Sequence, residues 1–233
     1  ESSLSRISDL TFLTHAGPEI GVASTKAFST QLVSLALLCC SIGRSNESIS
    51  QSKEQEIVAG LKRLPGLIHE TLLQETQIKK LAKSFKNKHS ALFLGRGTMH
   101  AIALEGALKL KEISYIHAEA YPAGELKHGP IALIDKNIPV IAIAPNDELL
   151  EKLKTNLYEV KSRGSRMIVF EDEKSGVSPM KDIEIFPITS NLGRITAPII
   201  FTIPLQLLSY HVAIIKNTDV DKPRNLAKSV TVE

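Results

Sequence analysis

The second half of the chain alternates short apolar runs with longer segments of helical spacing. The short runs are almost continuously apolar, as expected of strands that are covered on both faces. They are residues 91–94, 139–144, 167–170 and 183–188. The helical segments that separate or follow them are residues 100–114, 148–163 and 195–216. This alternation predicts an α/β fold in which a parallel sheet is flanked by helices.

The first part of the chain has a different pattern. Residues 8–14 alternate between polar and apolar side chains, which predicts a strand, and residues 28–42 read as an apolar helix. One strand cannot form a sheet by itself. We therefore expect residues 1–46 to be the C-terminal part of a domain whose other strands lie upstream of this chain.

A polar, Ser-rich break then marks the predicted start of a second domain, residues 47–216. Its first helices are expected at 55–64 and 67–86, before the alternating strands and helices begin. Residues 217–233 form a predicted tail, and its last residues alternate in polarity. We expect this tail to pack back on the body and to carry Lys228 into a site.

The composition is that of an ordinary globular protein, with 43% hydrophobic and 23% charged residues. The formal net charge of +3 is spread along the chain, so neither nucleic acid nor a membrane surface is an expected partner. Cys39 and Cys40 are neighbours in an apolar run, which indicates free thiols in a reducing compartment. The apolar stretch 195–215 contains Pro198 and Pro204, so a buried helix explains it better than a membrane span. We expect a cytoplasmic protein without a signal peptide.

The helix predicted over 100–114 carries the candidate chemistry. Glu105, Lys109 and Glu112 are four and three residues apart, so their charged groups share one helix face. A glycine loop precedes the helix, which places these charges near the carboxyl end of a strand, where open α/β sheets bind ligands. An ordinary solvated ion-pair face is the alternative interpretation of the same spacing.

Cofactor and metal motifs are missing from the sequence. The loop Gly95-Arg-Gly97 lacks the third glycine of a dinucleotide fingerprint and the Gly-Lys-Ser/Thr of a Walker loop. The segment His117-Ala-Glu119 is not followed by the Pro-Cys-x-x-Cys of zinc deaminases, and the histidines show no other metal-ligand spacing. We expect neither a metal nor a cofactor.

The residue types near this helix suit the movement of a proton between neighbouring carbons of a sugar. That reaction needs a carboxylate base, a group that opens the sugar ring, and a cation that polarises the carbonyl or forms an imine with it. Glu112, His128 in the loop 122–130, and a lysine could supply these groups.

Long segments of the chain resemble one enzyme family. They are residues 19–28, 103–115, 123–130 and 221–233, the last of which ends in Asn-Leu-Ala-Lys-Ser-Val-Thr-Val-Glu. In this order they are similar to the isomerase half of the glutamine–fructose-6-phosphate aminotransferase family, over essentially the whole chain. The resemblance implies flavodoxin-like sugar-isomerase (SIS) domains, one complete and one partial in this chain. It also implies an enzyme of amino-sugar biosynthesis that converts fructose 6-phosphate and glutamine-derived ammonia to glucosamine 6-phosphate.

The resemblance implies a role for each matching residue. Glu112 matches the residue that shuttles a proton between C1 and C2, and Lys109 matches a lysine that assists this movement. Lys228 matches the tail lysine that forms an imine with the open sugar. His128 matches the ring-opening histidine, which reaches the site from the neighbouring subunit and so implies a homodimer.

The resemblance further implies that the backbone at Val22 and Ala227 contacts the sugar phosphate. The family's phosphate-binding loop and its N-terminal glutaminase domain have no counterpart in this chain. We therefore expect residues 1–233 alone to be inactive.

Other functions are compatible with the same fold. One is a non-catalytic regulator that binds a sugar phosphate through an SIS domain, and another is a related phosphosugar deglycase or isomerase. The joint presence of Glu112, His128 and Lys228 favours an enzyme over a regulator. The ending 225–233 favours the aminotransferase over the other isomerases.

Overall fold

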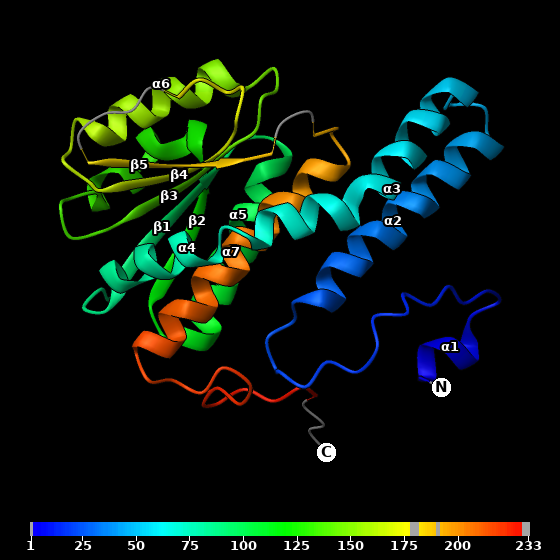
Figure 1. Ribbon diagram of the computed structural model, residues 1–233, viewed down its shortest axis with the longest axis horizontal. Helices are drawn as coiled ribbons and strands as arrows, with labels where there is room; N and C mark the ends of the chain where they lie inside the picture. Colours follow the sequence, from blue (N-terminus) through cyan, green and yellow to red (C-terminus); the bar gives the residue numbers. More distant parts are fainter. Residues whose placement is uncertain (1, 178–181, 190–191, 230–233) are drawn as a thin grey trace.

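The structure, a computed structural model, describes residues 2–177, 182–189 and 192–229. In these residues five parallel strands form one sheet, in the order β2-β1-β3-β4-β5 (Figure 1). The strands are β1 (Ser90–Gly95), β2 (His117–Pro122), β3 (Val140–Ala144), β4 (Met167–Asp172) and β5 (Ile183–Ile188). This is the strand order of flavodoxin-like sheets, so the predicted fold class is confirmed.

Helices precede, separate and follow the strands. The α-helices are α1 (Ser3–Ile7), α2 (Lys26–Ser45), α3 (Gln51–Leu72), α4 (Glu75–Ala82), α5 (Thr98–Ser114), α6 (Leu150–Lys161) and α7 (Thr196–Ile215). The short 3₁₀ helices are η1 (Lys83–Phe85), η2 (Ala123–His128) and η3 (Pro130–Leu133). The helices expected at 100–114, 148–163 and 195–216 are therefore confirmed with small shifts at their ends.

Different helices cover the two faces of the sheet (Figure 1). Successive side chains of a strand point to opposite faces, so Phe93 and Leu94 of β1 enter different cores. Phe93 packs in the core that includes α4, α5 and α7, whereas Leu94 packs in the core that includes α6. Strand β1 is buried from both sides, which explains its continuous apolar sequence.

Helix α7 lies in the first of these cores. Phe201, Leu205 and Leu208 are almost completely buried, so the expectation of a buried helix is confirmed. Among the described helices, α2 and α7 are long and apolar enough to cross a membrane by length and composition. In α7, 67% of this apolar window is buried inside the protein, against 11% in α2. This burial identifies α7 as a core helix.

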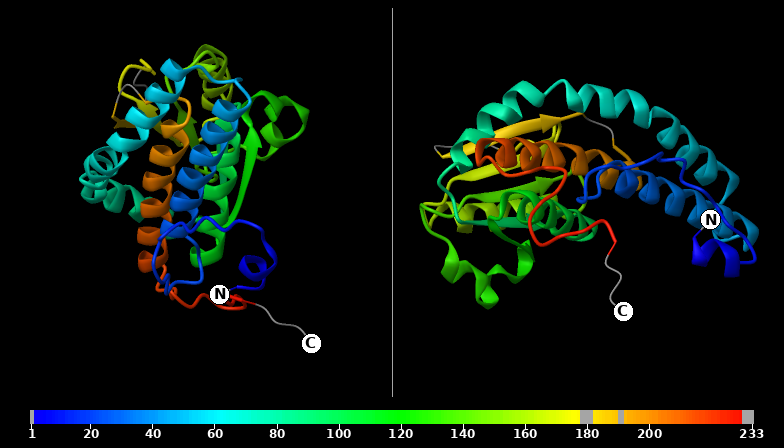
Figure 2. Two further views of the ribbon diagram at one scale, coloured as in Figure 1. Left: turned by 90° about the vertical axis from the view of Figure 1, so that its right-hand side faces the viewer. Right: turned by 90° about the horizontal axis from the view of Figure 1, so that it is seen from below.

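Helices α2 and α3 lie side by side and extend away from the sheet (Figures 1 and 2). The start of α2 is attached to α7, because Gln206 Nε2 donates a hydrogen bond to Thr25 O at 3.3 Å. The loop before α2 also meets the tail after α7, where Val22 N donates to Asp221 O at 2.9 Å. Segments from the two ends of the chain are thereby brought together beside α5 and α7.

The strand predictions are wrong at two places. Residues 8–14 form no strand, and Leu10 and Phe12 are exposed. Strands β2 and β5 form the sheet edges and neither pairs with residues 8–14, so that segment has no partner to support a strand. The segment His117–Pro122, whose polar sequence and terminal proline did not indicate a strand, forms β2 at one edge. An edge strand tolerates both features because only one of its sides must be paired.

The predicted break between the first helices of the second domain is also misplaced. Helix α3 continues through Pro65 to Leu72, although a proline removes one helical hydrogen bond. Leu64 and Leu67, on either side of the proline, are both buried in the core against α7 and hold the helix together. The break comes at Gln74 instead, whose Nε2 donates to Pro187 O at 2.6 Å.

Gly106 lies where α5 closely approaches both the sheet and α7. A Cβ atom here would be 2.7 Å from Leu205 Cδ1 and 3.0 Å from Phe93 Cε1, which is too close for an unshifted core. Gly66 on α3 offers a contrast, because no atom lies within 4 Å of the place where its Cβ would be. The two helical glycines therefore differ in the space around them.

We expect Gly106→Ala to lower the free energy of unfolding by about 1–3 kcal/mol, because the added methyl group overpacks the core. The matched Gly66→Ala should raise it by about 0.5–1 kcal/mol, because alanine favours the helix and meets no neighbour. Equilibrium unfolding in urea measures both changes. Equal effects of the two substitutions would contradict the close approach of α5 to α7.

Candidate active site

The charged face of α5 is buried. Lys109 is only 3% exposed; its Nζ donates to Glu112 Oε2 at 2.7 Å and lies 3.6 Å from Glu105 Oε1. The spacing of four and three residues along the helix brings both carboxylates to one ammonium group. The interpretation as an ordinary solvated ion-pair face is therefore wrong, because a buried ammonium group depends on its partners.

The two carboxylates differ in their surroundings. The side chain of Glu105 is 10% exposed and that of Glu112 is 21% exposed. Burial raises the pKa of Glu105, and the neighbouring Glu112 charge also raises it, although Lys109 acts in the opposite direction. Glu105 thus binds a proton more readily than an exposed glutamate does.

The tail after α7 folds back across the end of α5. Thr218 Oγ1 donates to Ile113 O at 2.5 Å, and Arg224 N donates to the Tyr115 hydroxyl at 2.8 Å. The Arg224 guanidinium carbon also lies 4.2 Å from the centre of the Tyr115 ring. The tail therefore contacts the body through Thr218 and Arg224, whereas Leu226, at the start of the alternating segment from which packing was expected, is 45% exposed. Residues 230–233 lie outside the described residues.

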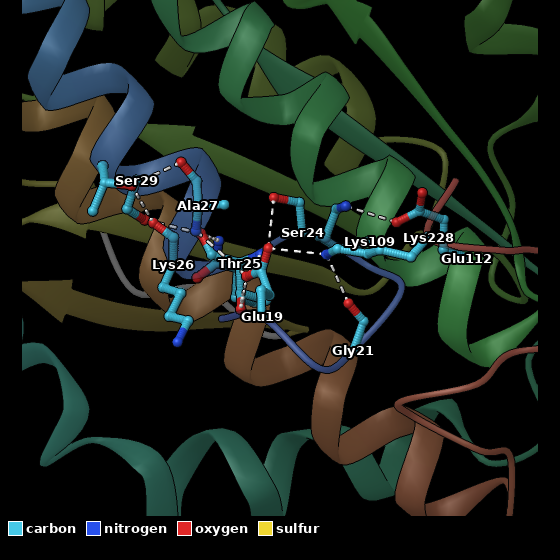
Figure 3. A network of polar contacts seen from close by, with 12 residues as sticks. Glu19, Gly21, Ser24, Thr25, Lys26, Ala27, Ser29, Lys109, Glu112 and Lys228 are labelled. Carbon is cyan, nitrogen blue, oxygen red and sulfur yellow. Dashed lines mark hydrogen bonds and ion pairs between the residues drawn. The ribbon is translucent and has the colours of Figure 1, made fainter. Parts of the chain in front are cut away.

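Lys228 of the tail reaches the loop before α2 (Figure 3). Its Nζ donates to Gly21 O at 2.8 Å and to Glu19 Oε2 at 3.2 Å. Glu19 Oε1 accepts hydrogen bonds from Thr25 N at 2.7 Å and from Ala27 N at 3.4 Å, at the start of α2. Thr25, the N-cap residue, makes no side-chain cap of its own. Glu19 therefore caps α2 and holds the tail lysine at the same time.

The environment of Glu19 strongly favours its ionised form. Burial by itself acts to raise the pKa of Glu19, but hydrogen bonds from Thr25, Lys228 and Ala27 outweigh burial and lower the pKa to about 2. The ordinary value is 4.5. Because the folded-state pKa is lowered, the stabilisation by this carboxylate is fully present above about pH 4.5 and is lost as the pH falls toward about 2.

Glu19 and Lys109 line the same cavity, whose volume is about 350 Å³. The cavity lies between the loop before α2, the buried face of α5, and α7 with the tail that follows it. Gln206, Tyr210 and Asp221 also line it. This volume suits a small polar ligand. The fold thus brings two pairs, Lys228 with Glu19 and Lys109 with Glu112, to one region (Figure 3).

His128 does not join this group within the chain. It ends η2, in a loop whose Ala123 and Leu126 pack in the core on the α6 side of the sheet, whereas α5 packs on the other side. Lys127 Nζ pairs with Glu159 Oε1 on α6 at 2.7 Å and holds the loop there. The side chain of His128 is 76% exposed. The structure therefore presents His128 outward from its own chain.

The remaining predicted contact residues lie close to Lys228 and Glu19. Val22 joins the loop before α2 to the tail through its amide, and Ala227 is an exposed residue directly before Lys228. Their contacts with a sugar stay predictions. Across the part of the chain that the structure describes, no three His, Cys, Asp or Glu side chains are grouped to hold a metal ion.

Sequence reasoning assigned no role to Glu19 or Tyr115, although both lie in segments quoted for the family resemblance. The sequence signal for Glu19 is a carboxylate a few residues before a helix start, where negative charge is favoured. Its link to Lys228 could not be found in this way, because the two residues are separated by nearly the whole chain.

Residues 84–216 match the family model of the SIS domain. The chain therefore belongs to the SIS-domain family, which agrees with its sheet order. The prediction that the α5 charges lie near the carboxyl end of a strand is wrong, because α5 runs back from that end of β1 and Lys109 and Glu112 are in its last turns. The glutamine–fructose-6-phosphate aminotransferase [isomerizing] of Pseudomonas aeruginosa is 58% identical over 232 residues, which are 100% of this chain and 38% of that protein. The same values hold for the protein of that name in Escherichia coli K12. The chain thus spans about two-fifths of the curated relatives that it matches.

Solved structures agree with this assignment. The C-terminal domain of glucosamine-fructose-6-phosphate aminotransferase from Francisella tularensis is 51% identical with a TM-score of 0.92, over 95% of this chain and 62% of that one. Glucosamine-6-phosphate deaminase from Thermotoga maritima is 26% identical with a TM-score of 0.72, over 99% of this chain and 64% of that one. The resemblance to the aminotransferase isomerase half that the sequence motifs indicated is confirmed.

We expect Lys109→Met to lower the free energy of unfolding by about 3 kcal/mol near neutral pH, because Glu105 and Glu112 lose the cation between them. The loss should shrink as the pH is lowered to about 5, since an unpaired buried carboxylate takes up a proton more readily. Denaturant unfolding at both pH values measures this.

The control for this prediction adds Glu105→Gln to Lys109→Met, which removes one of the unpaired charges. The double variant should recover part of the lost stability at neutral pH. A Lys109→Met protein as stable as the wild type at neutral pH would show that the buried ion pairs do not support the fold.

Proposed function

We propose that this chain carries the isomerase site of an isomerising glutamine–fructose-6-phosphate aminotransferase, which makes glucosamine 6-phosphate from fructose 6-phosphate and ammonia. The observation that carries the proposal is that Lys228 and Glu112 each form a hydrogen bond with a residue that lines one cavity, Lys228 with Glu19 and Glu112 with Lys109. An amine and a carboxylate that is paired with a lysine are the groups that imine formation and proton transfer require. The names of the relatives that share 58% identity agree with this chemistry.

Lys228 performs the first step. Its amine nitrogen attacks the C2 carbonyl carbon of the open sugar, the carbonyl oxygen leaves as water, and a protonated imine remains. Ammonia then takes the place of the Lys228 nitrogen at C2 and releases the free lysine. In the intact enzyme the ammonia comes from glutamine, through a glutaminase domain that is no part of residues 1–233.

Glu112 performs the proton transfer. Its carboxylate removes a proton from C1, next to the electron-withdrawing imine, and returns it to C2. The hydroxyl at C1 gives its proton to water as the aldehyde forms, so C2 is left with the neutral amino group of glucosamine 6-phosphate. Lys109 holds the Glu112 carboxylate through the 2.7 Å hydrogen bond and assists this step with its positive charge.

His128 opens the sugar ring from a second copy of the chain. Two features support this part of the proposal: the histidine is exposed, and its loop is held on the sheet face opposite α5. The active protein is then a homodimer in which each site combines Glu112 and Lys228 of one subunit with the histidine of the other. A reducing, cytoplasmic setting fits the free thiols of Cys39 and Cys40.

A second candidate function is the release of ammonia from glucosamine 6-phosphate. The similarity to the Thermotoga maritima deaminase favours it, because the same imine and proton-transfer steps can operate in that direction. The two functions differ in net reaction, so the product formed from each substrate separates them. The aminotransferase is our proposal because the relatives of that name match the whole chain at 58% identity.

Borohydride reduction tests the imine. A suitable protein is a chimera in which this chain replaces the matching 38% of the Escherichia coli relative. In the presence of fructose 6-phosphate, reduction should add a sugar-phosphate mass to the peptide that contains Lys228, and Lys228→Arg should abolish this adduct. An adduct on another lysine, with Lys228 unmodified, would refute the assignment.

Mixing of variants tests the shared site. Glu112→Gln and His128→Ala should each lower turnover by about a hundredfold or more, because a general acid or base is lost. Mixed dimers should regain up to about a quarter of the wild-type activity, since a random mixture gives half heterodimers with one intact site each. No recovery in samples shown to contain heterodimers would place His128 in the site of its own subunit.

A further inference from the structure

Glu19 is a nearly buried carboxylate whose two oxygens bind different partners. Oε1 accepts from Thr25 N at 2.7 Å, Thr25 Oγ1 at 3.0 Å and Ala27 N at 3.4 Å, so the N-terminal end of α2 holds it. Oε2 accepts from Ser24 Oγ and from Lys228 Nζ, both at 3.2 Å. The Glu19 side chain is 9% exposed, whereas that of Lys228 is 47% exposed. The carboxylate is thus more enclosed than the lysine and is held by more hydrogen bonds.

Among the charged residues of this cavity, Glu19 is the one that forms a hydrogen bond with Lys228. Asp221, Lys26 and Lys109 line the same cavity, so charges of both signs surround the ligand space. The hydrogen-bond acceptors of the Lys228 ammonium are Glu19 and the uncharged carbonyl of Gly21. Glu19 is therefore the carboxylate that sets the electrostatic environment of this nitrogen (Figure 3).

We propose that Glu19 is the positioning residue for Lys228: it holds the lysine nitrogen at the cavity and stabilises positive charge there, first on the ammonium and then on the protonated imine. The part of this proposal that concerns the imine rests on the proposed function. The part that concerns the free lysine does not.

The physical reason is that the same atom is positive at both stages. When the C–N bond forms and the carbonyl oxygen leaves as water, the nitrogen of the protonated imine occupies the place of the ammonium. A carboxylate already fixed by the α2 amides stabilises this charge without rearrangement of its surroundings. A positive imine nitrogen makes C2 easier for ammonia to attack, and that attack is the step that releases the free lysine.

The test uses Glu19→Gln, which preserves shape and keeps an amide oxygen to accept from the Thr25 and Ala27 amides. It replaces the negative oxygen that faces Lys228 by an uncharged group. The control Ser24→Ala removes the other hydrogen bond to the same oxygen and leaves the charge in place. Circular dichroism and urea unfolding of both variants check that each is folded.

The first measurement is made on residues 1–233 without sugar. Competitive acetylation near neutral pH compares Lys228 with Lys136, an exposed lysine on another loop, as the internal reference. Glu19→Gln should increase the relative reactivity of Lys228 about two- to fivefold, because the lysine nitrogen loses its charged hydrogen-bond partner and is more accessible to the reagent. Ser24→Ala should change it less than about twofold. Unchanged reactivity in Glu19→Gln would overturn the proposal.

The second measurement uses the chimera with the Escherichia coli relative. Glu19→Gln should lower kcat about 10- to 100-fold and change the KM for fructose 6-phosphate only about twofold, because the charge matters after the sugar has bound. If Glu19 only capped α2, the substitution would lower stability without lowering kcat at a nearly constant KM. An unchanged kcat would overturn the part of the proposal that concerns the imine. Wild-type protein that forms no borohydride adduct would refute the proposed function, whereas a changed Lys228 reactivity in the same series would still support the positioning role.

Discussion

The buried ammonium group of Lys109 constrains the arrangement around α5 more than any other polar contact in the site. A charge with 3% exposure is tolerated only beside opposite charges, so Glu105 and Glu112 must stay on the same helix face. That face cannot turn toward solvent without exposing the apolar residues of α5 that pack on the sheet and on α7. The position of the proposed base Glu112 is consequently fixed by the core.

The rest of the site is assembled from the two ends of the chain. The loop before α2 supplies Glu19, the tail after α7 supplies Lys228, and backbone hydrogen bonds such as Val22 to Asp221 join the two segments. Neither segment has regular structure there, so their geometry depends on specific contacts with Tyr115, Ile113 and the first turn of α2. A site built from such loops can admit and release a ligand more easily than one enclosed by strands.

Sequence patterns predicted the helices and strands whose burial places apolar residues at regular intervals. The buried strands and the helices α5, α6 and α7 were found because burial on one or two faces dictates which positions are apolar. The edge strand β2 was missed and a strand at 8–14 was wrongly expected, because short alternating segments depend on a neighbour for their conformation. The continuation of α3 through Pro65 likewise depends on the contacts of Leu64 and Leu67 with the core.

The sequence by itself determined the α/β fold and the shared face of Glu105, Lys109 and Glu112, and its family motifs led to the predicted roles of Lys228 and His128. These features follow from local spacing or from recognisable segments. Only the tertiary structure decided that the α5 charges are buried, that Glu19 holds Lys228, and that His128 lies across the sheet from them. Burial and contacts between distant segments are properties of the packed chain, because they depend on which surfaces meet.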